Sequence, residues 1–272
     1  MISRREWAAW ALAGSGSAAG AVTLPAPTVV PTTASTTAPT ASPTTAPTTA
    51  PVLRFAVGET WAPPYIELKG GQPVGGLMLE LMQAIARAAG ARAVYVPLPA
   101  LRVDAALADG EVDLHCLISP QWLAEPPPAA RLGPVMVVLE DVLAAMPGTA
   151  PVPLEDQPGL RVGTVLGYRY GPLDALFAEG RLVREDAPSQ QRMLDKLSRG
   201  RTSVAVVDRL VLAHFNRSLP PARRLVVLRS LRQTPTQCLL GTRLPLPTER
   251  LQLALNRVLA RGEFKRILAR YR

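Results

Sequence analysis

Residues 53–90 read LRFAVGETWAPPYIELKGGQPVGGLMLELMQAIARAAG and contain, in order, a strand, a loop and a helix. The apolar run 53–57 ends at Gly58, which is typical of a buried strand in a parallel sheet. Further along, apolar side chains recur at helical spacing on one face, and Gly90 ends the pattern as a helix C-cap does. These side chains belong to Met78, Leu81, Met82, Ile85 and Ala89. The stretch therefore predicts a strand followed by an amphipathic helix.

The residues after Gly90 continue to alternate strands and helices. We predict strands at 94–98 and 112–118, with a helix at 101–108 that Asp109-Gly110 closes. A β-α-β-α-β order predicts a parallel sheet with right-handed crossover connections.

A second unit with the same pattern follows. We predict strands at 161–165, 204–207 and 225–228, and helices after Ser189, from Thr248 and from 264 to the C-terminus. Asp208 lies directly after the strand 204–207, at its carboxyl end. The chain therefore has the pattern of an α/β protein with two α/β units.

The first 52 residues differ in composition from the rest. Residues 1–21 combine Arg4, Arg5, a weakly apolar stretch and small residues near position 21, which is the pattern of a secretory signal peptide. The opening Ser-Arg-Arg-Glu-Trp is similar to a twin-arginine export signal, and Sec export is the alternative. Residues 22–52 are almost entirely Thr, Ala, Pro, Ser and Val, so we expect a disordered linker. No cysteine lies near the predicted cleavage site, so we expect no lipid anchor.

The net charge of +9 raises the question of a nucleic-acid partner. The 30 basic residues are scattered and include no run of five, and no aromatic-basic motif accompanies them. We therefore predict no nucleic-acid binding. Beyond the signal peptide, no run of about 18 uninterrupted apolar residues predicts a membrane-spanning helix.

The folded part resembles the family-3 extracellular solute-binding proteins of ABC transporters, which have the type II periplasmic-binding-protein fold. Five segments in the family's order carry the resemblance: residues 53–90, GEVDLHCLISPQW at 110–122, LEDQPGLRVGTVLGYRYG at 154–171, GRTSVAVVD at 200–208 and LQLALNRVLARGEFKRILARY at 251–271. The resemblance implies a two-lobed α/β fold, each lobe a mostly parallel sheet flanked by helices. It also implies that the chain crosses a hinge twice, with lobe 1 at 53–141 plus 235–272 and lobe 2 at 142–234.

The sequence departs from the family's pattern at the ligand loop. Amino-acid binders of the family commonly carry Thr-Pro-Glu-Arg there, whose Arg clamps a carboxylate. This chain has Ser119-Pro120-Gln121-Trp122, so Trp122 stands at the Arg position. Met78 replaces the Asp of the family's Gly-Phe-Asp. Asp208 is retained where the family's Asp meets a ligand amine, which favours a cationic or neutral ligand. Arg169 of lobe 2 could substitute for the missing Arg, so a zwitterionic amino acid is the alternative ligand.

Eight residues are the candidate ligand contacts in the interlobe cleft: Trp61, Tyr65, Ser119, Trp122, Tyr168, Arg169, Tyr170 and Asp208. The aromatic side chains in this set could form a wall that stacks on the ligand or could pack on their own lobe. The three consecutive residues after Gly167 cannot all face one way, so we expect one or two of them to contact ligand. Asp208 has two interpretations, a ligand contact or the N-cap of a helix over 209–215.

Cys116 and Cys238 are the two cysteines of the chain. If the chain recrosses as the family does, their strands lie near one another, and a disulfide and two buried free thiols are the alternatives. His115 and His214 are too isolated to predict a metal site, and no nucleophile-base pair or cofactor motif is present. We expect His115 to pack on its strand.

The resemblance implies a periplasmic binding protein, not an enzyme. It would hold a small polar solute such as an amino acid or amine for ABC-type uptake, work with a membrane permease and act as a monomer. One alternative is a cyclohexadienyl or prephenate dehydratase-like enzyme, with Glu59, Glu80 and Asp208 as candidate acids. The other is an anchored ligand sensor with residues 22–52 as its stalk.

Overall fold

A computed structural model describes residues 50–123, 125, 128, 131–151 and 153–271. The predicted signal peptide and nearly all of the predicted linker lie outside the described residues. The first strand, β1, begins at Val52, the last residue assigned to that linker. No helix in the described ranges is long and apolar enough to cross a membrane.

Eight strands form one sheet in the order β4-β1-β5-β10-β6-β9-β7-β8. Their bounds are β1 Val52–Gly58, β4 Arg92–Leu98, β5 Leu114–Ile118, β6 Val137–Ala145, β7 Leu160–Val165, β8 Leu182–Ala187, β9 Val204–Asp208 and β10 Val226–Leu240. β1 pairs in parallel with β4 and β5 at one end of the sheet, and β7 pairs in parallel with β8 and β9 at the other. A separate hairpin joins β2, Glu67–Lys69, to β3, Gln72–Gly75. The fold is α/β with a mostly parallel sheet, as predicted.

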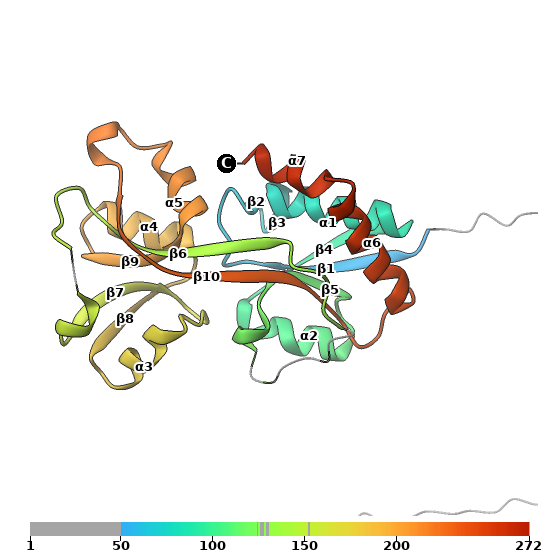
Figure 1. The fold of residues 1–272 in the computed structure, drawn as a ribbon, viewed down its shortest axis with the longest axis horizontal. Coiled ribbons are helices and arrows are strands. Elements are labelled where there is room, and N and C mark those ends of the chain that lie inside the picture. The colour runs from blue at the N-terminus through green and yellow to red at the C-terminus, as the bar shows by residue number, and fades with distance from the viewer. Residues whose placement is uncertain (1–49, 124, 126–127, 129–130, 152, 272) are drawn as a thin grey trace, which may run out of the picture. The chain divides into compact units, whose positions relative to one another are not determined.

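Two strands between these ends run antiparallel and connect them. β10 pairs with β6 from Val226 to Thr236 and with β5 from Gln237 to Leu240, and β6 also pairs with β9. Figure 1 shows β6 and β10 side by side between the two groups of helices. The prediction of a short strand at 225–228 was wrong in its length, because β10 continues through polar residues that do not resemble a buried strand.

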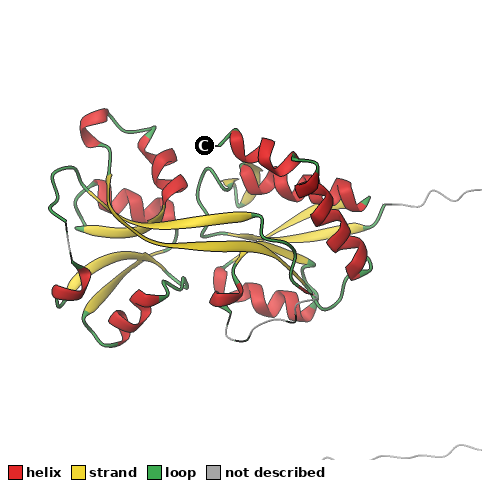
Figure 2. Ribbon diagram, viewed as in Figure 1, coloured by secondary structure: helices red, strands yellow, loops and turns green. Residues whose placement is uncertain are grey.

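Seven α-helices of the described chain lie on both sides of the strands (Figure 2). They are α1 Leu77–Ala89, α2 Val103–Asp109, α3 Pro172–Ala178, α4 Gln190–Ser198, α5 Arg209–Asn216, α6 Thr248–Ala260 and α7 Glu263–Ala269. The pattern that predicted α1 is confirmed, since Met78, Leu81, Met82 and Ile85 are buried. Gly90 ends this helix with φ at 66°, a left-handed conformation that glycine adopts without a Cβ clash.

The predicted division into lobes falls inside the two central strands. The boundary at 141/142 lies in β6 and the boundary at 234/235 lies in β10, where these strands pair with each other. Each proposed lobe would then hold one of the parallel ends of the sheet. The lobe boundaries remain a prediction.

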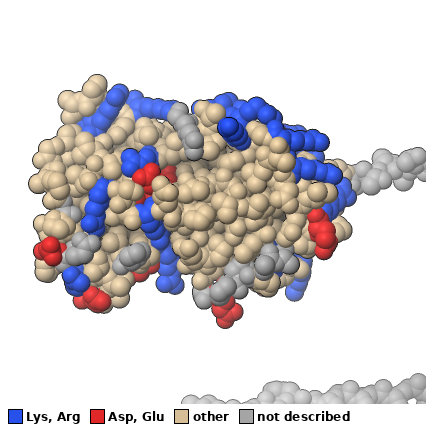
Figure 3. All heavy atoms as spheres, viewed as in Figure 1, with Lys and Arg blue, Asp and Glu red and all other residues tan. Residues whose placement is uncertain are grey.

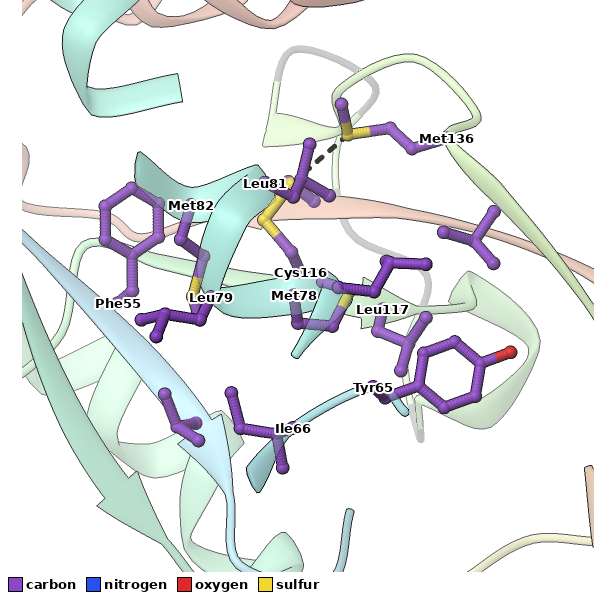
Figure 4. Packing of buried hydrophobic residues seen from close by; sticks show 14 of the residues in the cluster. Phe55, Tyr65, Ile66, Met78, Leu79, Leu81, Met82, Cys116, Leu117 and Met136 are labelled. Atoms are coloured by element: carbon purple, nitrogen blue, oxygen red, sulfur yellow. Dashed lines mark hydrogen bonds between the residues drawn. A yellow bond between two sulfur atoms is a disulfide. The ribbon is translucent and has the colours of Figure 1, made fainter. Parts of the chain in front are cut away.

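A disulfide joins Cys116 on β5 to Cys238 on β10. Both residues are buried in a core that includes Phe55, Met78 and Met82 (Figure 4). The bond therefore ties the antiparallel strand β10 to the parallel strands at the β1 end of the sheet.

Basic side chains gather along the α6–α7 edge in the view of Figure 3. The exposed basic residues of these two helices are Arg250, Arg257, Lys265 and Arg266, while Arg261 lies between the helices and Arg270 follows α7.

Candidate functional site

A cavity of about 260 Å³ lies where β1, β5 and β9 end. Side chains from both ends of the sheet line it, together with residues of β6 and β10. Seven of the eight predicted residues line it: Trp61, Tyr65, Trp122, Tyr168, Arg169, Tyr170 and Asp208. Ser119 is buried and precedes the 3-10 turn Pro120–Trp122, and it lies outside the cavity lining. The structure thus brings the loops after β1, β5, β7 and β9 to one place.

Trp61 in the loop after β1 stacks on His115 of β5, with ring centroids 5.5 Å apart and an angle of 25° between the planes. Gly58 gives the indole this position, because a Cβ at residue 58 would lie 2.7 Å from Trp61 Nε1. His115 is buried, and burial lowers the pKa of its imidazole to about 4, so the ring is neutral at pH 7. His115 therefore both packs on its strand, as predicted, and lines the cavity, which was not predicted.

Asp208 is the N-cap of α5, one of the two roles that its sequence position suggested, and it also lies in the wall of the cavity. It lines the cavity, and its Oδ1 caps α5 by accepting from the backbone N–H groups of Leu210 at 2.9 Å and Val211 at 3.2 Å. The same oxygen accepts from the Tyr65 hydroxyl at 3.1 Å, and Oδ2 accepts from the Glu140 N–H at 3.2 Å. Burial raises the pKa of this carboxyl to about 6 in spite of these four donors.

The turn after β7 directs its three predicted residues differently. The Tyr168 hydroxyl accepts a hydrogen bond from Thr60 at 3.0 Å, so it bridges to the loop after β1. Tyr170 is buried, and its hydroxyl accepts from the Val165 N–H at 2.7 Å, which holds the turn together. Arg169 is exposed at the cavity edge. Tyr168 and Arg169 are therefore the two residues of this turn that offer polar groups to a ligand.

An ion pair that sequence reasoning missed lies in the wall of the cavity. Arg232 Nε of β10 donates to Asp141 Oδ2 of β6 at 2.7 Å, and each side chain is 17% exposed. Burial raises the pKa of the Asp141 carboxyl, and Arg232 opposes that shift. Cross-strand pairing places Arg232 beside Asp141 and Asp141 beside Asp208, so three charged residues form a row across β10, β6 and β9.

Trp122 stands at the sequence position where the family pattern has an arginine. Its ring centroid lies 6.0 Å from the guanidinium carbon of Arg232. Its indole Nε1 is buried and has no hydrogen-bond partner among the described residues. The aromatic side chain and the arginine therefore form one corner of the cavity.

No group of three or more metal-ligating side chains occurs within the described ranges. The other two candidate acids that the sequence analysis named for an enzyme, Glu59 and Glu80, lie outside the cavity lining. Glu80 instead contacts Arg270 and Tyr271 at the C-terminus.

No protein-family model matches the chain, and no curated protein matches it. Solved structures do. An ancestral arginine-binding protein bound to arginine is 17% identical, covers 81% of this chain and 97% of its own, and has a TM-score of 0.67. An arginine-specific periplasmic binding protein from Salmonella typhimurium is 13% identical, with coverages of 81% and 99% and a TM-score of 0.67. An ancestral amino-acid-binding protein described as a precursor of cyclohexadienyl dehydratase is 16% identical, with coverages of 81% and 94% and a TM-score of 0.63. At these identities the likeness shows that this chain shares the fold of periplasmic binding proteins.

Proposed function

We propose that the chain is an exported solute-binding protein that holds a small polar solute, an amino acid or an amine, between two lobes. The observation that carries the proposal is a cavity built from the loops of both ends of the sheet. Its lining combines aromatic rings with carboxylates and two guanidinium groups, which is a composition that suits a small charged organic molecule.

Contacts across the cavity support a closing motion. Thr60 in the loop after β1 donates to the Tyr168 hydroxyl, and the Thr60 carbonyl accepts from the Gln190 N–H at 3.4 Å. Tyr65 in the same loop donates to Asp208 at the end of β9. In this proposal β6 and β10 are the hinge, and the solute adds contacts that favour the closed arrangement.

The proposal includes export, transport and a monomeric state. The predicted signal at 1–21 would send the chain to an oxidising compartment such as the periplasm, and the disulfide between Cys116 and Cys238 fits that environment. A membrane permease would then recognise the closed, loaded form. Members of the family that the sequence resembles deliver their solutes to a membrane permease.

Titration calorimetry on the purified chain tests the proposal. The protein is unfolded and refolded to remove any carried solute, and it is then titrated with amino acids, polyamines and small organic acids. We expect saturable binding of one solute per chain. Failure of the whole panel to bind refolded protein of native stability would reject the proposal.

An enzyme on the same fold is the second candidate. One of the structural neighbours is a precursor of a dehydratase, and Asp208 is a cavity carboxyl whose pKa of about 6 suits a general acid. Incubation of the purified chain with prephenate decides this point. Turnover that Asp208→Asn abolishes would favour the enzyme.

A further inference from the structure

Trp122 carries a hydrogen-bond donor that the described residues leave unused. The indole N–H can donate and cannot accept, and Nε1 is buried without a partner. Leaving such a group unpaired costs about 1 to 3 kcal/mol, so an acceptor is expected beside it. Trp122 lines the cavity, so a small movement of its side chain would present this N–H to a ligand oxygen.

Arg232 lies over the Trp122 ring, with its guanidinium carbon 6.0 Å from the ring centroid, and it also has an unused donor group. Its Nε donates to Asp141, and its Nη2 donates to the carbonyl of Arg169 at 2.9 Å. Within the described ranges no acceptor is bonded to Nη1. Gly171 allows the guanidinium to pack against the turn after β7, because a Cβ at residue 171 would lie 2.5 Å from Nη1.

We propose that a carboxylate of the solute binds in the corner between the Arg232 guanidinium and the Trp122 indole N–H. This inference rests on the proposed function and adds an orientation to it. Two donors, one of them charged, offer the two hydrogen bonds that a carboxylate accepts. The family pattern has an arginine at the position of Trp122. In this proposal Arg232 supplies the guanidinium that is missing there.

The charge row sets the direction of the solute. Asp208, Asp141 and Arg232 occupy adjacent strands, which lie about 4.8 Å apart, so the row spans about 10 Å from β9 to β10. Its acidic end attracts an ammonium group and its basic end attracts a carboxylate. Asp141 Oδ1, which accepts no hydrogen bond from a described residue, lies between them. The row therefore favours a solute whose carboxylate lies toward β10 and whose cationic group lies toward β9, near Asp141 Oδ1 for an α-ammonium or near Asp208 for a cation on a longer side chain.

Paired ligands test the inference on the full chain. Calorimetry compares each amino acid that binds with the amine that lacks its carboxylate, such as L-arginine with agmatine or L-phenylalanine with phenethylamine. We expect the wild-type chain to prefer the amino acid. Trp122→Phe keeps an aromatic ring and removes the N–H, so it should weaken amino-acid binding about tenfold, the value of one hydrogen bond to a charged group. Binding of the amine should change less than twofold.

Variants of the ion pair extend the test. Arg232→Gln leaves Asp141 buried without its cation, so the Arg232→Gln/Asp141→Asn double variant, which removes both charges, is measured beside it. Both should lose the preference for the carboxylate. Arg161→Gln removes an exposed arginine whose partner is Glu185, far from the cavity lining, and should leave both ligands unaffected.

The outcomes separate the two proposals. If amino acids bind and the Trp122 and double variants weaken amino acid and amine equally, the carboxylate corner is refuted while solute binding stands. The same holds if the wild-type chain prefers the amines. If no solute in either series binds the wild-type chain, the proposed function itself fails.

Discussion

The clearest consequence of the site geometry concerns Asp208 and the pH dependence of stability. The carboxyl pKa is 3.8 in ordinary peptides and about 6 in the folded chain, because burial disfavours the charged form. A difference of about two pKa units corresponds to about 3 kcal/mol, since one unit is worth about 1.4 kcal/mol. The folded state therefore takes up this proton more readily than the unfolded state. The stability that Asp208 contributes is fully present below about pH 4 and is lost as the pH rises through about 6.

Asp208→Asn isolates this contribution. Asparagine also caps helices, so α5 keeps a side-chain acceptor at its first turn, and the residue no longer titrates. Urea denaturation of both proteins from pH 4 to pH 7.5 gives the free energy of unfolding of each. We expect the wild-type value minus the variant value to fall by about 3 kcal/mol across this range. All other groups titrate alike in the two proteins, so they cancel in the difference. A difference that stays flat, or that rises with pH, would refute the reasoning about burial.

Three further predictions concern neighbours of the site. Reducing the Cys116–Cys238 disulfide, which closes a loop with a sequence separation of 122, should lower the free energy of unfolding by about 3 to 5 kcal/mol in urea titrations. Equal stability with and without reductant would contradict this. Tyr65→Phe removes a donor that lowers the pKa of Asp208, so the transition in the pH difference profile should move to higher pH. If the pH of the transition did not change, the Tyr65 hydroxyl would not be bonded to the Asp208 carboxylate in solution. Gly58→Ala should push the Trp61 indole off His115, changing tryptophan fluorescence and costing about 1 to 3 kcal/mol of stability, whereas an unchanged spectrum and melt would show that the loop yields freely.

Local sequence pattern sufficed for the elements whose signals are local. The helical spacing of apolar residues and the stop at Gly90 gave α1, and the apolar run before Asp208 gave β9. Asp208 could be recognised as a helix cap because that role depends on residues two and three positions away. The loops after β1 and β7 could be placed at the cavity because parallel strands present their carboxyl ends at one edge of a sheet.

The central strands could not be predicted in the same way. β10 includes the stretch Arg-Ser-Leu-Arg-Gln-Thr-Pro-Thr-Gln at 229–237, whose burial changes along its length because it passes from β6 to β5. Register shifts near Arg229 and Arg232 interrupt the two-residue alternation further. Asp141 and Arg232 are 91 residues apart, and their ion pair depends on the register of β6 and β10. No local motif encodes such a register, so this part of the site was missed.

The same two strands carry the charge row and lie between the two parallel ends of the sheet. Arg232 on β10 contacts Asp141 on β6, the Arg169 carbonyl in the turn after β7, and the Trp122 ring in the loop after β5. At the other end of the charge row, Asp208 accepts from Tyr65, which arrives in the loop after β1. Each end of the row is therefore in contact with segments from both parallel ends of the sheet. A solute that bridges the row would touch both proposed lobes and the strands on which they turn. In such an arrangement the charged groups that select the solute also connect it to β6 and β10, the proposed hinge strands. Specificity and closure would then depend on the same few side chains.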